Sequence, residues 1–269
     1  MSTDKEIPLQ ILDDEALKAL AARRGWPFHE APARALRAGL LPERYARNVT
    51  ALTMEEQIRL CESRVLIVGC GGLGGVLATT LARAGVGFLR LVDGDVFAAS
   101  NLNRQWLADS ESLGRPKAVV ARERVAAINP FVETEAAAAF VDEANALDLV
   151  AGTDLILDAL DNLAGRFVLA GAARSLGRPF IHAGVAGWWG QLTTLLPTAS
   201  TGLEAIYGAR RSRDPAEEAL GVLGAAAAIM GSLQAMEAIR LLTGRPPAHA
   251  GTLLYFDGES GSFQTMPLA

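Results

Sequence analysis

A glycine-rich run in the first third of the chain has the residue types and spacing of a nucleotide-binding loop. Gly69, Gly71 and Gly74 fit the pattern G-x-G-x-x-G and directly follow four apolar residues, Val65 to Val68. Between a strand and a helix, the missing side chains let backbone N–H groups and the helix N-terminus approach a phosphate. Asp93 ends the next apolar run, 19 residues beyond Gly74, near the spacing of a carboxylate that binds a ribose hydroxyl. The pattern predicts a nucleotide site, and by itself it does not separate NAD from ATP.

The loop after Asp93 carries short polar side chains and one arginine. It reads Asp93-Gly-Asp-Val-Phe-Ala-Ala-Ser-Asn-Leu-Asn-Arg-Gln105. Ser100, Asn101 and Asn103 can fix a turn by bonding backbone groups, and the planar guanidinium of Arg104 suits a phosphate. A dinucleotide enzyme has no obvious use for this block, which therefore favours ATP. An exposed loop with a solvated arginine is the alternative.

Two further segments add charge to the predicted site. In Gly114-Arg-Pro-Lys117, the proline fits the first turn of a helix and places Arg115 and Lys117 at its positive end. Cations are disfavoured there, so we expect an anion nearby, such as a polyphosphate; a lysine lying over apolar surface is the alternative. In Asp154-Leu-Ile-Leu-Asp158-Ala-Leu-Asp161-Asn162, Asp161 would follow a strand beside the glycine-loop strand if the order is 3-2-1-4. There it could hold magnesium, whereas an N-cap role for Asp161 and Asn162 is the alternative.

The elements that must position these residues alternate along most of the chain. Residues 1 to about 60 are expected to form a helical N-terminal segment, with helices over 13–24 and 32–41. Residues 61–269 are expected to form the nucleotide-binding domain. Its strands are expected at 65–68, 88–92, 132–136, 154–157 and 179–183, and its helices at 75–84, 116–128 and 163–176. This order predicts an α/β, Rossmann-like fold with a mostly parallel sheet and helices on both faces.

The last third of the chain differs from this alternation. Residues 191–196, 252–256 and 262–267 are expected to form an antiparallel extension at the C-terminal end, with Asp257-Gly258 and Ser260-Gly261 as turns. Residues 198–218 are expected to form a mobile loop. The uncharged stretch 219–236 approaches the length of a membrane span, but its many alanines and glycines favour a helix buried by close packing.

Composition excludes several classes of protein. A net charge of -5 and a pI near 5.3 argue against a nucleic-acid binder. Two cysteines, Cys61 and Cys70, exclude a disulfide framework and suit a reducing cytoplasm. The start of the chain has no signal-peptide pattern. The three histidines (29, 182 and 249) lack metal-ligand spacing. Trp188-Trp189 either lie on a surface that binds a partner's tail or pack in the core.

The four motifs together resemble the E1-like activating-enzyme family, which includes the MoeB, ThiF and HesA adenylyltransferases and the ubiquitin-activating enzymes. The resemblance covers about residues 43 to 197, with the blocks in the family's order. It implies that the chain uses ATP and Mg²⁺ to adenylate the C-terminal Gly-Gly carboxylate of a small ubiquitin-like sulfur-carrier protein, as in molybdopterin or thiamine synthesis. It also implies a homodimer. The charge and the composition predict neither nucleic acid nor membrane as a partner.

The resemblance assigns roles to individual residues. Gly72 belongs to the ATP loop and Asp93 to ribose recognition, Asp161 holds magnesium, and three residues contact the phosphates: Asn101, Arg104 and Lys117. In Glu43-Arg-Tyr-Ala-Arg-Asn48, Arg47 is the arginine expected to cross a dimer interface to the partner's ATP, with Arg44 as the second choice.

The chain departs from this family at two points. It has no cysteine after Cys70, so neither the two zinc-binding C-x-x-C pairs nor a thioester-forming cysteine is present, and we expect no structural zinc and no covalent intermediate. Three alternatives stay open: a tRNA-modifying dehydratase of the same family, an NAD-dependent oxidoreductase, and a non-catalytic scaffold that keeps the fold.

Overall fold

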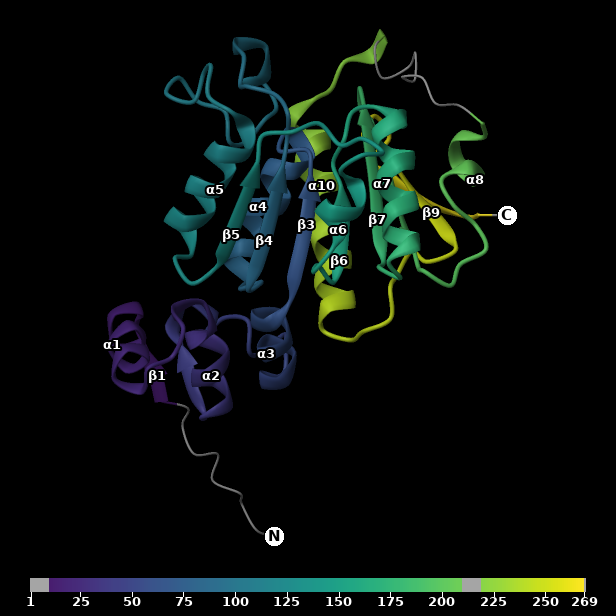
Figure 1. Ribbon diagram of the computed structural model, residues 1–269. Helices are drawn as coiled ribbons and strands as arrows, with labels where there is room; N and C mark the ends of the chain where they lie inside the picture. Colours follow the sequence, from purple (N-terminus) through teal and green to yellow (C-terminus); the bar gives the residue numbers. More distant parts are fainter. Residues whose placement is uncertain (1–9, 210–218, 269) are drawn as a thin grey trace.

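An eight-stranded sheet runs through the centre of the molecule in the order β10-β9-β8-β7-β6-β3-β4-β5 (Figure 1). The computed structural model describes residues 10–209 and 219–268. The five strands from β7 to β5 in that order are parallel: β3 (Arg64–Val68), β4 (Phe88–Val92), β5 (Glu133–Ala137), β6 (Leu155–Asp158) and β7 (Phe180–Ala186). Because β3 lies between β4 and β6, the expected 3-2-1-4 order is confirmed and the ends of these strands share one edge.

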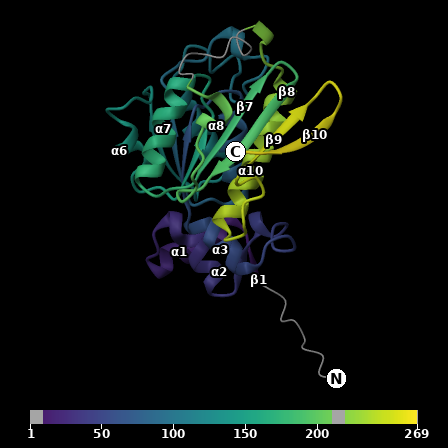
Figure 2. The same ribbon diagram turned by 90° about the vertical axis from the view of Figure 1, so that its right-hand side faces the viewer.

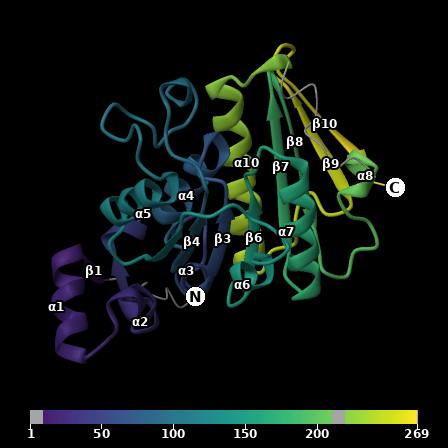
Figure 3. The ribbon, with the colours of Figure 1, turned by 45° about the horizontal axis from the view of Figure 1, so that its top comes forward.

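Alternate residues of the parallel strands face opposite sides of the sheet, and helices cover both sides (Figure 3). Val65 and Ile67 of β3 pack into one apolar core with α4 (Gly72–Ala84), α5 (Lys117–Ile128) and α10 (Gly224–Leu242). Leu66 and Val68 pack into the other with α6 (Ala146–Val150), α7 (Leu163–Ser175) and α8 (Glu204–Tyr207). The predicted Rossmann-like α/β fold is therefore confirmed.

The remaining strands extend the sheet in antiparallel fashion (Figure 2). They are β8 (Trp189–Leu195), β9 (Thr252–Asp257) and β10 (Ser262–Pro267). The turn residues between β9 and β10 follow the sequence expectation, and Gly261 takes a φ of 69°. The loop expected over 198–218 contains α8, and residues 210–218 of that expectation lie outside the described residues.

The N-terminal segment lies at the amino ends of the parallel strands (Figure 1). It contains β1 (Gln10–Leu12), α1 (Asp14–Arg24), α2 (Ala31–Arg37), β2 (Leu40–Pro42) and α3 (Met54–Glu62). The helix expected over 32–41 was too long: α2 stops at Arg37, Gly39 adopts a φ of 75°, and Leu40 begins a strand that pairs with β1. The helix α3 was not predicted from the sequence, although Thr53 and Glu56 form a capping box at its start.

The helix α10 arises from the uncharged stretch noted in the sequence. By length and composition it is the one helix among the described residues that could cross a membrane, and 44% of its apolar window is buried inside the protein. It packs against α4, β7 and β8, and Gly231 lets it approach Val76 of α4 closely. The small residues of this stretch therefore serve helix packing on the sheet, as the sequence predicted.

Candidate active site

A cleft of about 310 Å³ lies at the carboxyl ends of β3, β4 and β6. This volume is at the lower end of the range for small-molecule sites. Eight of the residues singled out from the sequence line it: Gly69, Gly71, Gly72, Asp93, Arg104, Lys117, Asp161 and Asn162. The cleft therefore brings together the glycine loop, both candidate phosphate-binding cations and the candidate metal ligand.

The glycine loop is shaped first by the chain's own packing. Gly69 has a φ of 96°, and a Cβ there would collide with the carbonyl of Ala159 on the neighbouring β6 turn. A Cβ on Gly74 would overlap the carbonyl of Gly69, so this turn into α4 requires both glycines. Gly71 and Gly72 face the cleft, where the N-terminal end of α4 opens, and this end attracts anions.

Asp93, directly after β4, is held in place by two backbone N–H groups. Its oxygens accept hydrogen bonds from the backbone N–H of Cys70 at 2.7 Å and of Asp95 at 2.8 Å. Burial raises the pKa of the Asp93 carboxyl, and these two N–H donors act in the opposite direction. The contact with Cys70 fixes Asp93 directly beside the glycine loop, where a ribose hydroxyl would reach it.

Arg104 is oriented by its own loop. Its Nη1 donates to the carbonyl of Ser100 at 2.8 Å and to Oδ1 of Asn103 at 2.9 Å. Asn101 is buried, and its Oδ1 accepts from the N–H of Ala98, so its described role is to cap a short turn. Ser100, Asn101 and Asn103 do not line the cleft; their contacts position the arginine that does.

The two cations at the start of α5, Arg115 and Lys117, have different partners. Lys117 is 6% exposed and its Nζ lies 3.0 Å from Oδ2 of Asp95 at the wall of the cleft. Arg115 instead pairs with Glu123 at 2.7 Å and does not line the cleft. The expected anion near this helix end is thus supplied in part by the protein, and Lys117 alone of the two faces the site.

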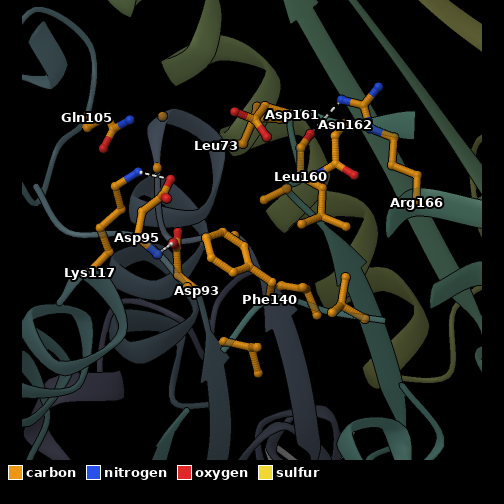
Figure 4. A pocket seen from close by; sticks show the side chains of 18 of the residues that line it. Leu73, Asp93, Asp95, Gln105, Lys117, Phe140, Leu160, Asp161, Asn162 and Arg166 are labelled. Carbon is orange, nitrogen blue, oxygen red and sulfur yellow. Dashed lines mark hydrogen bonds and ion pairs between the residues drawn. The ribbon is translucent and has the colours of Figure 1, made fainter. Parts of the chain in front are cut away.

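Asp161 and Asn162 follow β6 on the opposite wall (Figure 4). Oδ1 of Asn162 accepts from the N–H of Gly165 at 2.8 Å, so Asn162 is the N-cap of α7, which was the alternative weighed for it. The turn is braced from both sides: Oδ1 of Asp158 accepts from the N–H of Leu160, and Nη2 of Arg166 donates to the carbonyl of Leu160.

Several cleft residues were missed in the sequence. Phe140 is 67% exposed and lies over Gly94, next to Asp93, between the two walls (Figure 4). Gln105 is 7% exposed, and its Oε1 has no hydrogen-bond partner within the described residues. Asp95 belongs to the segment that follows Asp93, but nothing in the sequence assigned it a role. Nothing in the local pattern marks Phe140, because it reaches the cleft from the segment after β5.

The two arginines considered for the dimer arm have different surroundings. Arg44 pairs with Asp14 and donates to the carbonyl of Ile128. Arg47 is exposed and makes no ion pair within residues 10–209 and 219–268. Asn48 contacts the C-terminal end of α4, at Ala84, while the cleft lies at the other end of this 13-residue helix. The separation is about 20 Å, so Arg47 cannot reach the cleft of its own chain.

The remaining candidates lie outside the cleft. Burial raises the pKa of the Cys61 thiol to about 12 and that of Cys70 well above its ordinary value, so both are packing residues. Trp188 is 54% exposed, whereas Trp189 stacks on Tyr255. His182 is buried below the cleft, and within the described parts of the chain no three His, Cys, Asp or Glu side chains form a metal-binding group.

Comparison with known proteins agrees with this geometry. Residues 45–269 match the ThiF family. The chain is 37% identical over 228 residues to the sulfur carrier protein ThiS adenylyltransferase of Escherichia coli K12, covering 84% of this chain and 90% of that one. It is also 37% identical to the molybdopterin-synthase adenylyltransferase of the same organism, covering 84% and 92% of the two chains.

A solved structure with lower sequence identity has a similar fold. The crystal structure of PaaA superposes with a TM-score of 0.73 at 23% identity, covering 94% of this chain and 81% of that one. The family match over most of the sequence and two relatives of similar length identify the molecule: the chain belongs to the ThiF family and is an ATP-using adenylyltransferase of the E1-like class.

Proposed function

We propose that this chain adenylates the C-terminal carboxylate of a small ubiquitin-like sulfur-carrier protein ending in Gly-Gly. The carboxylate oxygen would attack the α-phosphorus of ATP, the bond from that phosphorus to the bridging oxygen would break, and pyrophosphate would leave. The observation that carries this proposal is the convergence of Arg104, Lys117 and Asp161 on one cleft with the glycine loop. Relatives named for a sulfur carrier support the choice of substrate.

The chain's own residues would act by positioning and by balancing charge. The N-terminus of α4 and the loop at Gly71 and Gly72 would hold the phosphates, and Arg104 and Lys117 would offset charge that develops on the leaving group. Asp93 would bind the ribose. Phe140 offers an exposed aromatic face beside Asp93, so we assign it to the nucleobase.

Asp161 is the residue that would hold Mg²⁺. It lies in the cleft opposite Lys117 and Asp95, and hard carboxylate oxygens are the ligands that Mg²⁺ uses together with phosphates. Asp95, a second carboxylate of the cleft, pairs with Lys117 on the other wall, so the fit to the ion rests on Asp161 together with the phosphates. When bound, the ion would supply further charge stabilisation to the phosphates.

The product is proposed to be the carrier acyl-adenylate, with no covalent bond to this chain. Both cysteines are buried, and burial favours the neutral thiol in each. Neither thiol is therefore available as a thiolate nucleophile. Carrier trapped on the chain through a thiol-labile bond would contradict this part of the proposal.

A homodimer is proposed because Arg47 lies too far from its own cleft to act there. It could reach a nucleotide only in a second copy of the chain. Mixing inactive Arg47→Ala and Asp161→Ala chains should restore part of the activity, because a mixed dimer has one intact site. An absence of rescue, with mixed dimers present, would contradict a shared site.

Exchange of labelled pyrophosphate into ATP tests the proposal directly. It should require Mg²⁺ and one protein from a panel of Gly-Gly-ending carriers, and it should fall at least about 100-fold in Asp161→Ala and Arg104→Ala. Gly171→Ala, on the exposed side of α7, is the matched control. Tight NAD binding without Mg²⁺-dependent ATP binding would overturn the proposal in favour of an oxidoreductase.

A further inference from the structure

A buried polar network lies under the wall of the cleft that carries Asp161. His182 of β7 is completely buried, and its Nδ1 lies 2.6 Å from Oδ2 of Asp158, at the end of β6. Its Nε2 lies 2.9 Å from the hydroxyl of Tyr207, the last residue of α8. The network joins residues 24 to 49 positions apart in the sequence, and the proposed chemistry does not use His182 or Tyr207.

Two further side chains form hydrogen bonds with the Tyr207 hydroxyl. Gln191 of β8 donates to it through Nε2, and Arg166 of α7 donates through Nη1 at 3.1 Å. Arg166 is 2% exposed and lines the cleft, where its Nη2 donates to the carbonyl of Leu160 at 2.6 Å (Figure 4). One guanidinium therefore contacts both Tyr207 and the turn that carries Asp161.

The hydrogen-bond directions in this network follow from its donors. Arg166 and Gln191 both donate to the Tyr207 oxygen, which uses its two lone pairs. One arrangement accommodates these contacts: the Tyr207 hydroxyl donates to Nε2 of His182, and Nδ1–H of His182 donates to Asp158. The histidine is neutral in this arrangement, and burial, which lowers its pKa, acts in the same direction.

The far end of the network is the Asp161 turn. Asp158 accepts from His182 with one oxygen and from the N–H of Leu160 with the other, at 3.0 Å. Leu160 immediately precedes Asp161, and it is held at its N–H by Asp158 and at its carbonyl by Arg166. Tyr207 contacts Arg166 directly and is linked to Asp158 through His182, so a change at its hydroxyl acts on both sides of the turn.

We propose that Tyr207 and His182 are positioning residues that couple the docking of α8 on the sheet to the geometry of the Asp161 turn. When the Tyr207 hydroxyl is seated, Asp158 and Arg166 are fixed and Asp161 is held in the cleft. When α8 leaves the sheet, His182, Gln191 and Arg166 lose a shared partner and the turn loosens. This proposal rests on the proposed function only in taking Mg²⁺ and ATP as the ligands that Asp161 serves.

Calorimetric binding of a non-hydrolysable ATP analogue, with and without Mg²⁺, tests the coupling. In Tyr207→Phe the gain in affinity that Mg²⁺ confers should shrink about tenfold, as expected when a group supporting a metal ligand is lost. Affinity without Mg²⁺ should stay within about twofold. The matched control is Thr194→Val, because this change also removes a buried hydroxyl, but the hydroxyl of Thr194, on β8, donates to Glu237 on the α10 side. Similar behaviour of the two variants would overturn the proposal.

Amide hydrogen exchange separates this proposal from the proposed function. The Leu160 N–H should exchange faster in Tyr207→Phe than in a Thr194→Val protein of equal thermal stability, whether or not a nucleotide binds. If the natural chain binds no analogue, the proposed function fails and the exchange rate still decides the coupling. Unchanged protection of the Leu160 N–H in Tyr207→Phe would contradict the coupling between Tyr207 and the Asp161 turn.

Discussion

The two walls of the cleft are held in different ways. The loop wall, residues 69–74, is built by backbone: glycines allow close turns, and α4 begins where the turn ends. The network wall, residues 158–162 with Arg166, His182 and Tyr207, is built by buried side chains from four elements. A backbone-built wall tolerates almost no added atom, whereas a side-chain-built wall can be loosened one hydrogen bond at a time.

The largest effect is expected at the loop wall. Gly74→Ala should lower the free energy of unfolding by about 3 kcal/mol, because its Cβ would overlap the Gly69 carbonyl and the backbone would have to move. Chemical denaturation measures this change in the free energy of unfolding. Gly171→Ala, in open space on α7, should instead stabilise by about 0.5–1 kcal/mol. Equal effects at the two glycines would show that the loop wall is not tightly closed.

Between the walls, the two cations at the start of α5 should differ sharply. Lys117→Met should reduce pyrophosphate exchange about 100-fold, because a buried charge at the proposed phosphate site is lost. Arg115→Met should change it less than about twofold, since Arg115 pairs with Glu123 away from the cleft. A large loss in Arg115→Met would mean that both cations serve the nucleotide.

The network wall should make stability depend on pH. The pKa of His182 lies below its ordinary 6.5 in the folded chain, facing Asp158, Arg166 and Tyr207. As pH falls through about 6.5, the unfolded chain takes up this proton first, so the free energy of unfolding should fall by up to about 1.4 kcal/mol per pH unit. Denaturation of the natural chain and of His182→Gln between pH 7.5 and 5.5 should show a steeper decline in the natural chain. Parallel curves would contradict the neutral, buried histidine.

The smallest effect is expected at Phe140, which belongs to neither wall. Phe140→Ala should raise KM for ATP about fivefold, near 1 kcal/mol of lost stacking, with kcat little changed. Leu176→Ala, which removes an exposed apolar side chain at the end of α7, is the control. If kcat falls and KM does not, Phe140 does more than bind the base.

The same contrast explains how much the sequence predicted. The loop wall follows from a local pattern, so the sequence predicted the strand–glycine–helix order, and Asp93 lies in the cleft beside it. The sequence also predicted that Asp161 follows β6, but not the side chains that hold its turn. The network wall depends on pairings such as Asp158 with His182 and Arg166 with Tyr207, which no local pattern encodes. Phe140 reached the cleft only because Gly94 leaves room for its ring. At Gly39, a positive φ ended a helix that the apolar pattern would have continued.

The most direct test of the central claim is a crystal structure of the chain with Mg²⁺ and a non-hydrolysable ATP analogue. The account predicts the triphosphate against the glycine loop, with Arg104 and Lys117 on its oxygens, Asp161 on the metal side and the ribose on Asp93. A nucleotide bound elsewhere, or one whose phosphates leave Arg104, Lys117 or Asp161 turned away, would contradict it.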